Sequence, residues 1–242
     1  MPLQEAHDQA GPALILLVHS GLCDARMWDG FDLPGATAYE MRGFGSNPLP
    51  PTGEFSHAED LENALGGERA ALVGASFGGL VSLELAARRP DLVSELVLLD
   101  APLFDHSPWS PEFERYDETE TELFEQGEYR AAAELNADFW LSEAAGPELR
   151  PRVIEMQERA FELQSESEAE EAEHEPIDLG AIRARTLVVV GELDKPEFHA
   201  IAERLASEID GAQSARVERA GHLPALERPE ETARLVRDFL GR

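Results

Sequence analysis

The 242-residue chain contains one cysteine, Cys23, and one lysine, Lys195. A single cysteine excludes an internal disulfide and a cysteine-based zinc site. Basic residues are few: 20 lysines and arginines stand against 49 aspartates and glutamates, and the formal net charge is −29. Because so acidic a chain repels phosphates, we expect it to bind neither nucleic acid nor anionic membrane surfaces.

Long apolar runs are also missing. The run ALILLV, from Ala13 to Val18, is too short to span a bilayer. Acidic residues precede it, whereas a secretory signal begins with basic ones. We therefore expect a cytoplasmic protein that does not associate with membranes.

Short apolar runs do alternate with helical patterns over most of the chain. The predicted strands are 13–18, 35–41, 69–75, 94–101, 186–194 and 212–220, and the predicted helices are 57–65, 77–89, 196–209 and 229–240. Strands and helices that alternate in this way predict an α/β fold, a mostly parallel sheet with helices on both faces.

The alternation stops between Pro102 and Ile177. This segment has helical periodicity, few β-branched residues and many glutamates. It predicts a helical cap insertion at 103–177, between core segments 1–102 and 178–242. Inside it, the nearly all-polar stretch QSESEAEEAEHEP (164–176) is typical of a solvated helix end or a mobile linker.

A candidate nucleophile lies in VGASFGG, from Val73 to Gly79. A strand, then G-x-S-x-G, then a helix is the pattern of a nucleophile elbow. The turn holds the Ser76 hydroxyl at the carboxyl end of the strand, beside a helix N-terminus that favours developing negative charge. The alternative is a glycine-rich turn with a capping serine.

A serine hydroxyl needs a base, and the base needs an acid that orients it. Among the seven histidines, His222 lies in a loop between the last strand and the last helix. Asp194 follows a buried strand and is the predicted acid. Asp100 is the alternative, because its strand ends at the same edge of the sheet.

A tetrahedral intermediate also needs two backbone N–H donors. We expect one from Phe77, the residue after the serine, and one from Gly21 in the loop after the first strand, with Leu22 as the alternative. His19 in the same loop is predicted to pack and fix the loop rather than act as a base.

The chain resembles the α/β-hydrolase family over nearly its whole length. The resemblance rests on five stretches in order: LLVHSG, MRGFGSN, VGASFGG, VVVGELD and AGHLPALERPEE. It implies that Ser76 is the nucleophile, Asp194 the acid and His222 the base, with Gly21 and Phe77 at the oxyanion positions. Two of the stretches resemble 3-oxoadipate enol-lactonases and related small esterases.

The resemblance also has departures. The family's usual His-Gly is His19-Ser20, and its usual D-x-R-G-x-G-x-S ends here in Asn47. Only about a dozen residues precede ALILLV, where family members usually carry two antiparallel strands. At most one short strand fits there, so we expect a trimmed sheet edge.

The expected activity is hydrolysis of a carboxylic ester or lactone through an acyl-enzyme on Ser76. No cofactor and no metal are expected, and the expected partner is a small-molecule substrate for a monomer or small homo-oligomer. A carbon–carbon bond hydrolase or cofactor-free perhydrolase would use the same residues. A non-catalytic receptor or interaction protein of the same fold is the alternative of another class.

The substrate is not encoded in these motifs, because pocket walls decide it. The insertion supplies the candidate wall residues Trp109, Phe139, Trp140 and Phe161. Its glutamates, if they face the pocket mouth, would disfavour an anionic substrate such as an enol-lactone that carries a carboxylate.

Overall fold

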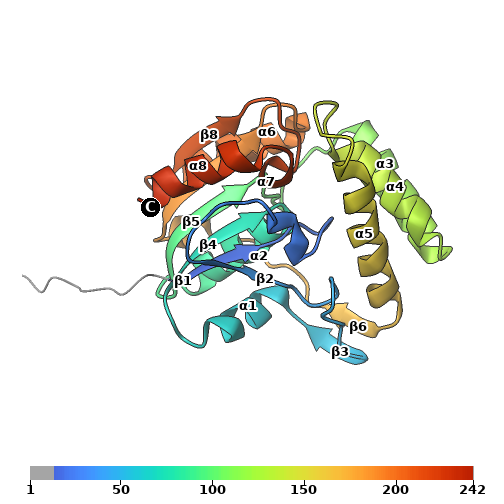
Figure 1. The fold of residues 1–242 in the computed structure, drawn as a ribbon. Helices are drawn as coiled ribbons and strands as arrows, with labels where there is room; N and C mark the ends of the chain where they lie inside the picture. The colour runs from blue at the N-terminus through green and yellow to red at the C-terminus, as the bar shows by residue number, and fades with distance from the viewer. Residues whose placement is uncertain (1–13, 242) are drawn as a thin grey trace, which may run out of the picture.

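The computed structural model describes residues 14–241. Its centre is a six-stranded sheet in the order β2-β1-β4-β5-β7-β8 (Figure 1). The strands are β1 (Leu14–Val18), β2 (Ala36–Tyr39), β4 (Ala70–Ala75), β5 (Val93–Leu99), β7 (Arg185–Gly191) and β8 (Gln213–Val217). Every neighbouring pair in this sheet is parallel. The predicted α/β class is therefore confirmed.

The helices of the core begin and end where the local sequence dictates. They are α1 (His57–Leu65), α2 (Phe77–Arg88), α6 (Pro196–Glu208), α7 (Pro224–Glu227) and α8 (Pro229–Leu240), with short 3-10 turns η1 (Ala25–Trp28) and η2 (Leu179–Ala181). The Ser56 side chain accepts the Glu59 N–H at the start of α1, and Gly66 ends the helix with φ of 58°. A proline at the first turn opens α6, α7 and α8.

Successive residues of the strands face two separate cores. Leu16 and Leu72 pack with α1, α2 and α6, whereas Ile15 and Val73 pack with η1, α7, α8 and residues of the inserted helices. Both faces of the sheet are thus covered by apolar side chains, which explains why its strands read as continuous apolar runs. Because the strands are buried on both faces, the positions of their carboxyl ends are fixed, and the candidate site lies at these ends.

Three helices follow β5 and lie beside the core: α3 (Pro111–Glu125), α4 (Tyr129–Trp140) and α5 (Leu149–Ser165). Figure 1 shows them as a separate group next to the sheet. Residues of all three line the pocket that contains Ser76. Since Ser76 follows β4, these helices lie over the carboxyl edge of the sheet.

The expected polar linker at 164–176 contains a strand instead. Glu168–Glu171 form β6, which pairs in parallel with β3 (Thr52–Phe55), a strand that the sequence did not reveal (Figure 1). Glu168 and Glu170 are exposed, while Ala169 and Glu171 are half-buried. The period-two alternation was hidden because glutamates occupy the exposed positions and one of the inward positions.

The expected short strand before the first apolar run lies outside the described residues. Within residues 14–241, helices that combine the length and the apolar character needed to cross a bilayer are absent.

Candidate active site

The turn at Ser76 has the geometry of a strained elbow. Ser76 has φ of 49° and ψ of −119°, a left-handed conformation that costs a non-glycine residue free energy. The flanking glycines are sterically required: a Cβ on Gly74 would collide with the carbonyl of Gly78, and a Cβ on Gly78 would collide with the carbonyls of Val18 and His19. The sequence therefore brings β4, α2 and the end of β1 into backbone contact and holds the serine hydroxyl at the edge of the sheet.

His222 bridges the serine and an aspartate. Its Nε2 lies 2.8 Å from Ser76 Oγ, and its Nδ1 lies 2.9 Å from Asp194 Oδ2. The three side chains that the sequence singled out thus lie together, at the ends of β4, β7 and β8. Asp100, the alternative acid, instead accepts the Gly191 N–H at 2.9 Å.

The environment of Asp194 favours its ionised form. Burial raises the pKa of Asp194, but the charge of His222 and the hydrogen bonds from His222, Asp100 and the Lys195 N–H outweigh burial and leave the pKa below its ordinary value. The Lys195 N–H donates to Asp194 Oδ1 at 2.7 Å. Asp194 can therefore orient the imidazole and stabilise an imidazolium.

The loop that carries His222 is fixed from both sides. The Glu227 carboxylate accepts the Gly221 N–H at 3.1 and 3.2 Å. The His222 ring packs against Trp140 and Phe198, with ring centroids 4.2 and 4.3 Å away. These contacts hold the imidazole in the orientation in which its two nitrogens reach Ser76 and Asp194.

Two backbone N–H groups without partners among the described residues lie close together beside Ser76. Within residues 14–241 the N–H groups of Gly21 and Phe77 have no hydrogen-bond partner, and a Cβ built on Gly21 would lie 3.3 Å from Phe77 Cβ. The N–H of Leu22, the alternative donor, is used by the Ser20 hydroxyl at 3.2 Å. The geometry therefore favours Gly21 over Leu22.

His19 is a structural histidine in this arrangement. It is fully buried, its Nδ1 lies 2.9 Å from the Ser20 carbonyl, and its Nε2 accepts the Met41 N–H at 3.0 Å. Burial lowers the pKa of His19 to about 4, so the ring is neutral. It fixes the loop to the chain after β2.

Gln157 of α5 connects the inserted helices to the loop after β1 that carries Gly21. Its side chain is 4% exposed. With its NH₂ group turned toward the loop, the amide donates to the carbonyls of Gly21 and Leu22 at 3.0 and 3.2 Å. Neither the composition of α5 nor its spacing had singled out this residue.

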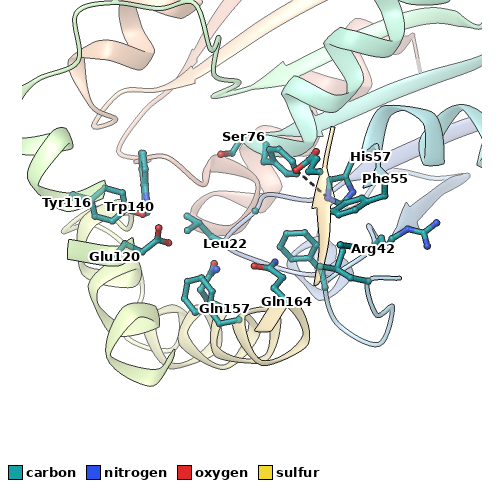
Figure 2. A pocket seen from close by; sticks show the side chains of 17 residues that line it. Leu22, Arg42, Phe55, His57, Ser76, Tyr116, Glu120, Trp140, Gln157 and Gln164 are labelled. Atoms are coloured by element: carbon teal, nitrogen blue, oxygen red, sulfur yellow. Dashed lines mark hydrogen bonds and ion pairs between the residues drawn. The ribbon is translucent and has the colours of Figure 1, made fainter. Parts of the chain in front are cut away.

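A pocket of about 520 Å³ opens beside Ser76 (Figure 2). Tyr116, Trp140 and Glu120 line one side and Arg42 and His57 the other (Figure 2). Trp140 Nε1 donates to Tyr116 Oη, which donates to Asn136 Oδ1, each at 2.8 Å, and Asn136 Nδ2 donates to Glu120 at 2.9 Å. This hydrogen-bonded wall joins α3 to α4.

Two of the four candidate wall aromatics line the pocket and two do not. Trp140 and Phe161 are in its lining. Trp109 stacks on Phe113 at 4.2 Å, and Phe139 stacks on Tyr116 at 4.0 Å. The i, i+4 spacing of Tyr116 and Glu120, matched by that of Asn136 and Trp140, is a signal for paired helix faces that the sequence itself contains.

One cluster in residues 14–241 brings potential metal ligands together: atoms of Asp100, Asp194 and His222 lie within 4.8 Å of one another. Both nitrogens of His222 are already used by Ser76 and Asp194. A metal there would have to break the serine–histidine–aspartate chain, so the donor set fits proton transfer better than metal binding.

A doubly wound parallel sheet with a strained serine elbow and an imidazole at its carboxyl edge defines the α/β-hydrolase class of fold. The sequence matches the alpha/beta hydrolase family over residues 15–235, and the chain belongs to that family.

Known proteins place the chain among hydrolases. It is 27% identical over 259 residues to a 2-hydroxymuconate semialdehyde hydrolase of Pseudomonas putida, a match that covers 97% of this chain and 89% of that protein. The solved structure of a thermophilic esterase from Thermogutta terrifontis, with malate bound, is 26% identical, with a TM-score of 0.74 over 96% of this chain and 90% of the esterase. The enol-lactonase from Burkholderia xenovorans LB400 shares the fold at 21% identity and a TM-score of 0.77, over 97% and 94% of the two chains.

Proposed function

We propose that the protein hydrolyses a carboxylic ester or lactone of a small molecule through an acyl-enzyme on Ser76. The observation that carries this proposal is the continuous contact from Ser76 through His222 to Asp194, at 2.8 and 2.9 Å, at the wall of a pocket. Nucleophile, base and orienting acid are then within hydrogen-bond reach, as acyl transfer requires.

The steps follow from this geometry. Ser76 Oγ attacks the substrate carbonyl carbon while His222 Nε2 takes its proton. The Gly21 and Phe77 N–H groups stabilise the oxyanion, and the imidazolium protonates the departing alkoxide. Water, deprotonated by His222, then attacks the acyl-enzyme and releases the acid and the serine.

The pocket supports a neutral rather than an anionic substrate. Glu120 and Glu171 both line it, and although burial raises the pKa of each carboxyl, to about 7 for Glu171, the ionised form of each would repel a substrate carboxylate. Arg42, a cation in the same wall, is engaged by both oxygens of Asp60 at 2.7 Å. A substrate carboxylate would meet acids and a neutralised arginine, which argues against an enol-lactone with a free carboxylate.

We further propose that residues 103–177 act as a cap over the core formed by 1–102 and 178–242. The support is that α3, α4 and α5 form walls of the pocket, and that residues 103–177 contribute no strand to the central sheet. On this assignment, substrate selection depends on the cap and bond cleavage on the core.

The test is turnover of p-nitrophenyl acetate and of a panel of neutral esters and lactones by the wild type and by Ser76→Ala. We expect turnover by the wild type, loss of it in the variant, and labelling of Ser76 by a fluorophosphonate. If the wild type is neither active on any panel member nor labelled, the protein is a non-catalytic member of its fold.

A second candidate is cleavage of a bond other than an ester, as in a carbon–carbon hydrolase or a perhydrolase. The supporting observation is the Pseudomonas putida relative, whose name identifies a semialdehyde rather than an ester as its substrate. Faster turnover of 2-hydroxymuconate semialdehyde than of every ester in the panel would favour this candidate.

A further inference from the structure

Asp100, next to the proposed acid, has an unusual backbone. It follows β5 directly, is 2% exposed and has φ of 49°, a conformation that costs a non-glycine residue free energy. Its own N–H donates to the Val189 carbonyl at 2.9 Å, which continues the sheet pairing with β7. A glycine would adopt this backbone conformation without strain. The presence of an aspartate therefore indicates that its side chain makes contacts that offset the strain.

The two carboxyl oxygens of Asp100 have different surroundings. Oδ1 accepts the Gly191 N–H at 2.9 Å, where β7 ends and the loop to Asp194 begins. Oδ2 is buried, and no donor among the described residues reaches it. Carboxyl oxygens of Asp100 and Asp194 approach within 4.8 Å. An orphaned carboxylate oxygen in such a place is costly, whereas a carboxylic acid O–H there would have an acceptor.

Two buried carboxyls this close do not both ionise. The groups that face Asp100 are Asp194, with His222 behind it, and Glu227 from α7. Burial, Asp194 and Glu227 raise the pKa of Asp100 well above its ordinary value, while His222 favours the ionised form of Asp194. The shared proton therefore belongs on Asp100.

We propose that Asp100 is a positioning residue for Asp194: a neutral carboxylic acid that donates its O–H to the Asp194 carboxylate while Oδ1 accepts the Gly191 N–H. The inference rests on the proposed roles of Ser76, His222 and Asp194. Asp100 keeps its proton through the whole cycle, and the proton that moves is the one exchanged between Ser76 and His222. The chain of hydrogen bonds then runs Asp100, Asp194, His222, Ser76.

The experiment compares Asp100→Asn with Asp100→Leu in the full chain. Asparagine keeps the acceptor for Gly191 and a donor for Asp194 but cannot ionise. We expect kcat/KM of Asp100→Asn within about threefold of the wild type and an unchanged acidic limb of its pH profile, because a neutral group replaces a neutral group. Asp100→Leu should lower kcat about 10- to 100-fold with little change in KM.

The pH profile separates positioning from mere packing. Without the O–H donor of Asp100, Asp194 becomes more basic and stabilises the protonated imidazole of His222 more strongly. The acidic limb of kcat/KM, which reports protonation of this imidazole, should therefore move to higher pH in Asp100→Leu. If Asp100 is an anion in the wild type, Asp100→Asn removes a negative charge beside the imidazole and moves the limb to lower pH. A downward move of about half a unit or more overturns the proposal.

A readout without turnover protects the test against a variant that does not fold and against failure of the proposed function. The difference infrared spectrum of wild type minus Asp100→Asn at pH 7 should contain the C=O stretch of a protonated carboxyl. A carboxylate band in its place overturns the proposal, whether or not the protein hydrolyses esters.

Discussion

At the scale of single residues, His222 has both ring nitrogens engaged and its ring packed against two aromatic side chains. Nδ1 meets Asp194 and Nε2 meets Ser76, while Trp140 and Phe198 lie against the ring. Rotation of the imidazole would break two hydrogen bonds and two aromatic contacts together. The proposed proton acceptor is therefore held in place before substrate arrives, which is what preorganised catalysis needs.

Because the residues act as one unit, their removal should not be additive. Ser76→Ala and His222→Ala should each lower kcat on a neutral ester by about 10⁴- to 10⁶-fold, and the double variant should be little slower than either. The measurement is kcat of the three variants, with circular dichroism melts as the folding control. Single losses that multiply in the double variant would mean that the two residues act independently.

At the scale of elements, α5 holds the loop after β1, which carries Gly21 and Leu22, through one amide. Gln157→Glu would place acceptors against the carbonyls of Gly21 and Leu22, so the variant should lose about 1 to 3 kcal/mol of stability and part of its kcat. Chemical denaturation and steady-state kinetics measure the two effects.

Gln164→Glu is the matched control on the same helix. Its amide reaches the Gly43 carbonyl at 3.4 Å, a longer and therefore weaker contact. Gln164→Glu should therefore change the stability and kcat only slightly. Equal losses in the two variants would show that added negative charge on α5, rather than the lost hydrogen bonds, is responsible.

Strand β6 brings a titrating carboxyl into the wall of the pocket. Burial raises the pKa of Glu171 to about 7 from an ordinary value of 4.5. The folded state thus binds this proton more tightly than the unfolded state, so the contribution to stability is present below pH 4.5 and is lost as pH rises through about 7. Burial lowers the pKa of neighbouring His57 to about 4, which acts in the opposite direction.

Glu171→Gln isolates this contribution. Between pH 5 and 8 the wild type should lose on the order of 1 kcal/mol of unfolding free energy relative to the variant. Urea denaturation of both proteins at each pH measures the difference. Parallel curves for the two proteins would mean that Glu171 is ionised throughout this range.

The predictability of each element followed its burial. Strands β4, β5 and β7 are covered on both faces, so apolar runs predicted them, and the glycines of the elbow marked the serine because sterics permit nothing larger. Strands β3 and β6 lie outside the central sheet and carry polar residues, so no apolar run marked them. Gln157 was not predicted, and Asp100 was predicted only as the alternative acid, for another reason: their partners are backbone groups or a second carboxyl distant in sequence, and a single sequence does not reveal such contacts.

At the scale of the whole molecule, the net charge of −29 makes the folded chain repel itself. Salt at about 0.15 M screens charges beyond roughly 8 Å. We therefore expect moderate sodium chloride to raise the melting temperature by about 2 to 4 °C for each kcal/mol of repulsion removed. Potassium chloride at equal ionic strength should act alike. A melting temperature that does not respond to salt would mean that repulsion among the acidic side chains contributes little to the free energy of unfolding.

Salt should also distinguish substrates by charge. Glu120 and Glu171 line the pocket, so screening should raise the initial rate on an anionic ester more than on a matched neutral one. Equal responses would remove the objection to an anionic lactone. A single ester pair with the same leaving group keeps the chemistry constant.

Lys195 joins the loop of the proposed acid to helices α3 and α4. Its ammonium lies 3.0 Å from Glu112 of α3 and 3.9 Å from the centroid of the Phe139 ring of α4, while its N–H binds Asp194. Since it is the chain's only lysine, reagents that acylate or carbamylate amines find a single ε-amine here. Cyanate in an aged urea solution would neutralise the one lysine charge that contacts α3 and α4 beside Asp194. The same chemistry offers a dye one side-chain amine, placed where α3 and α4 meet the loop after β7.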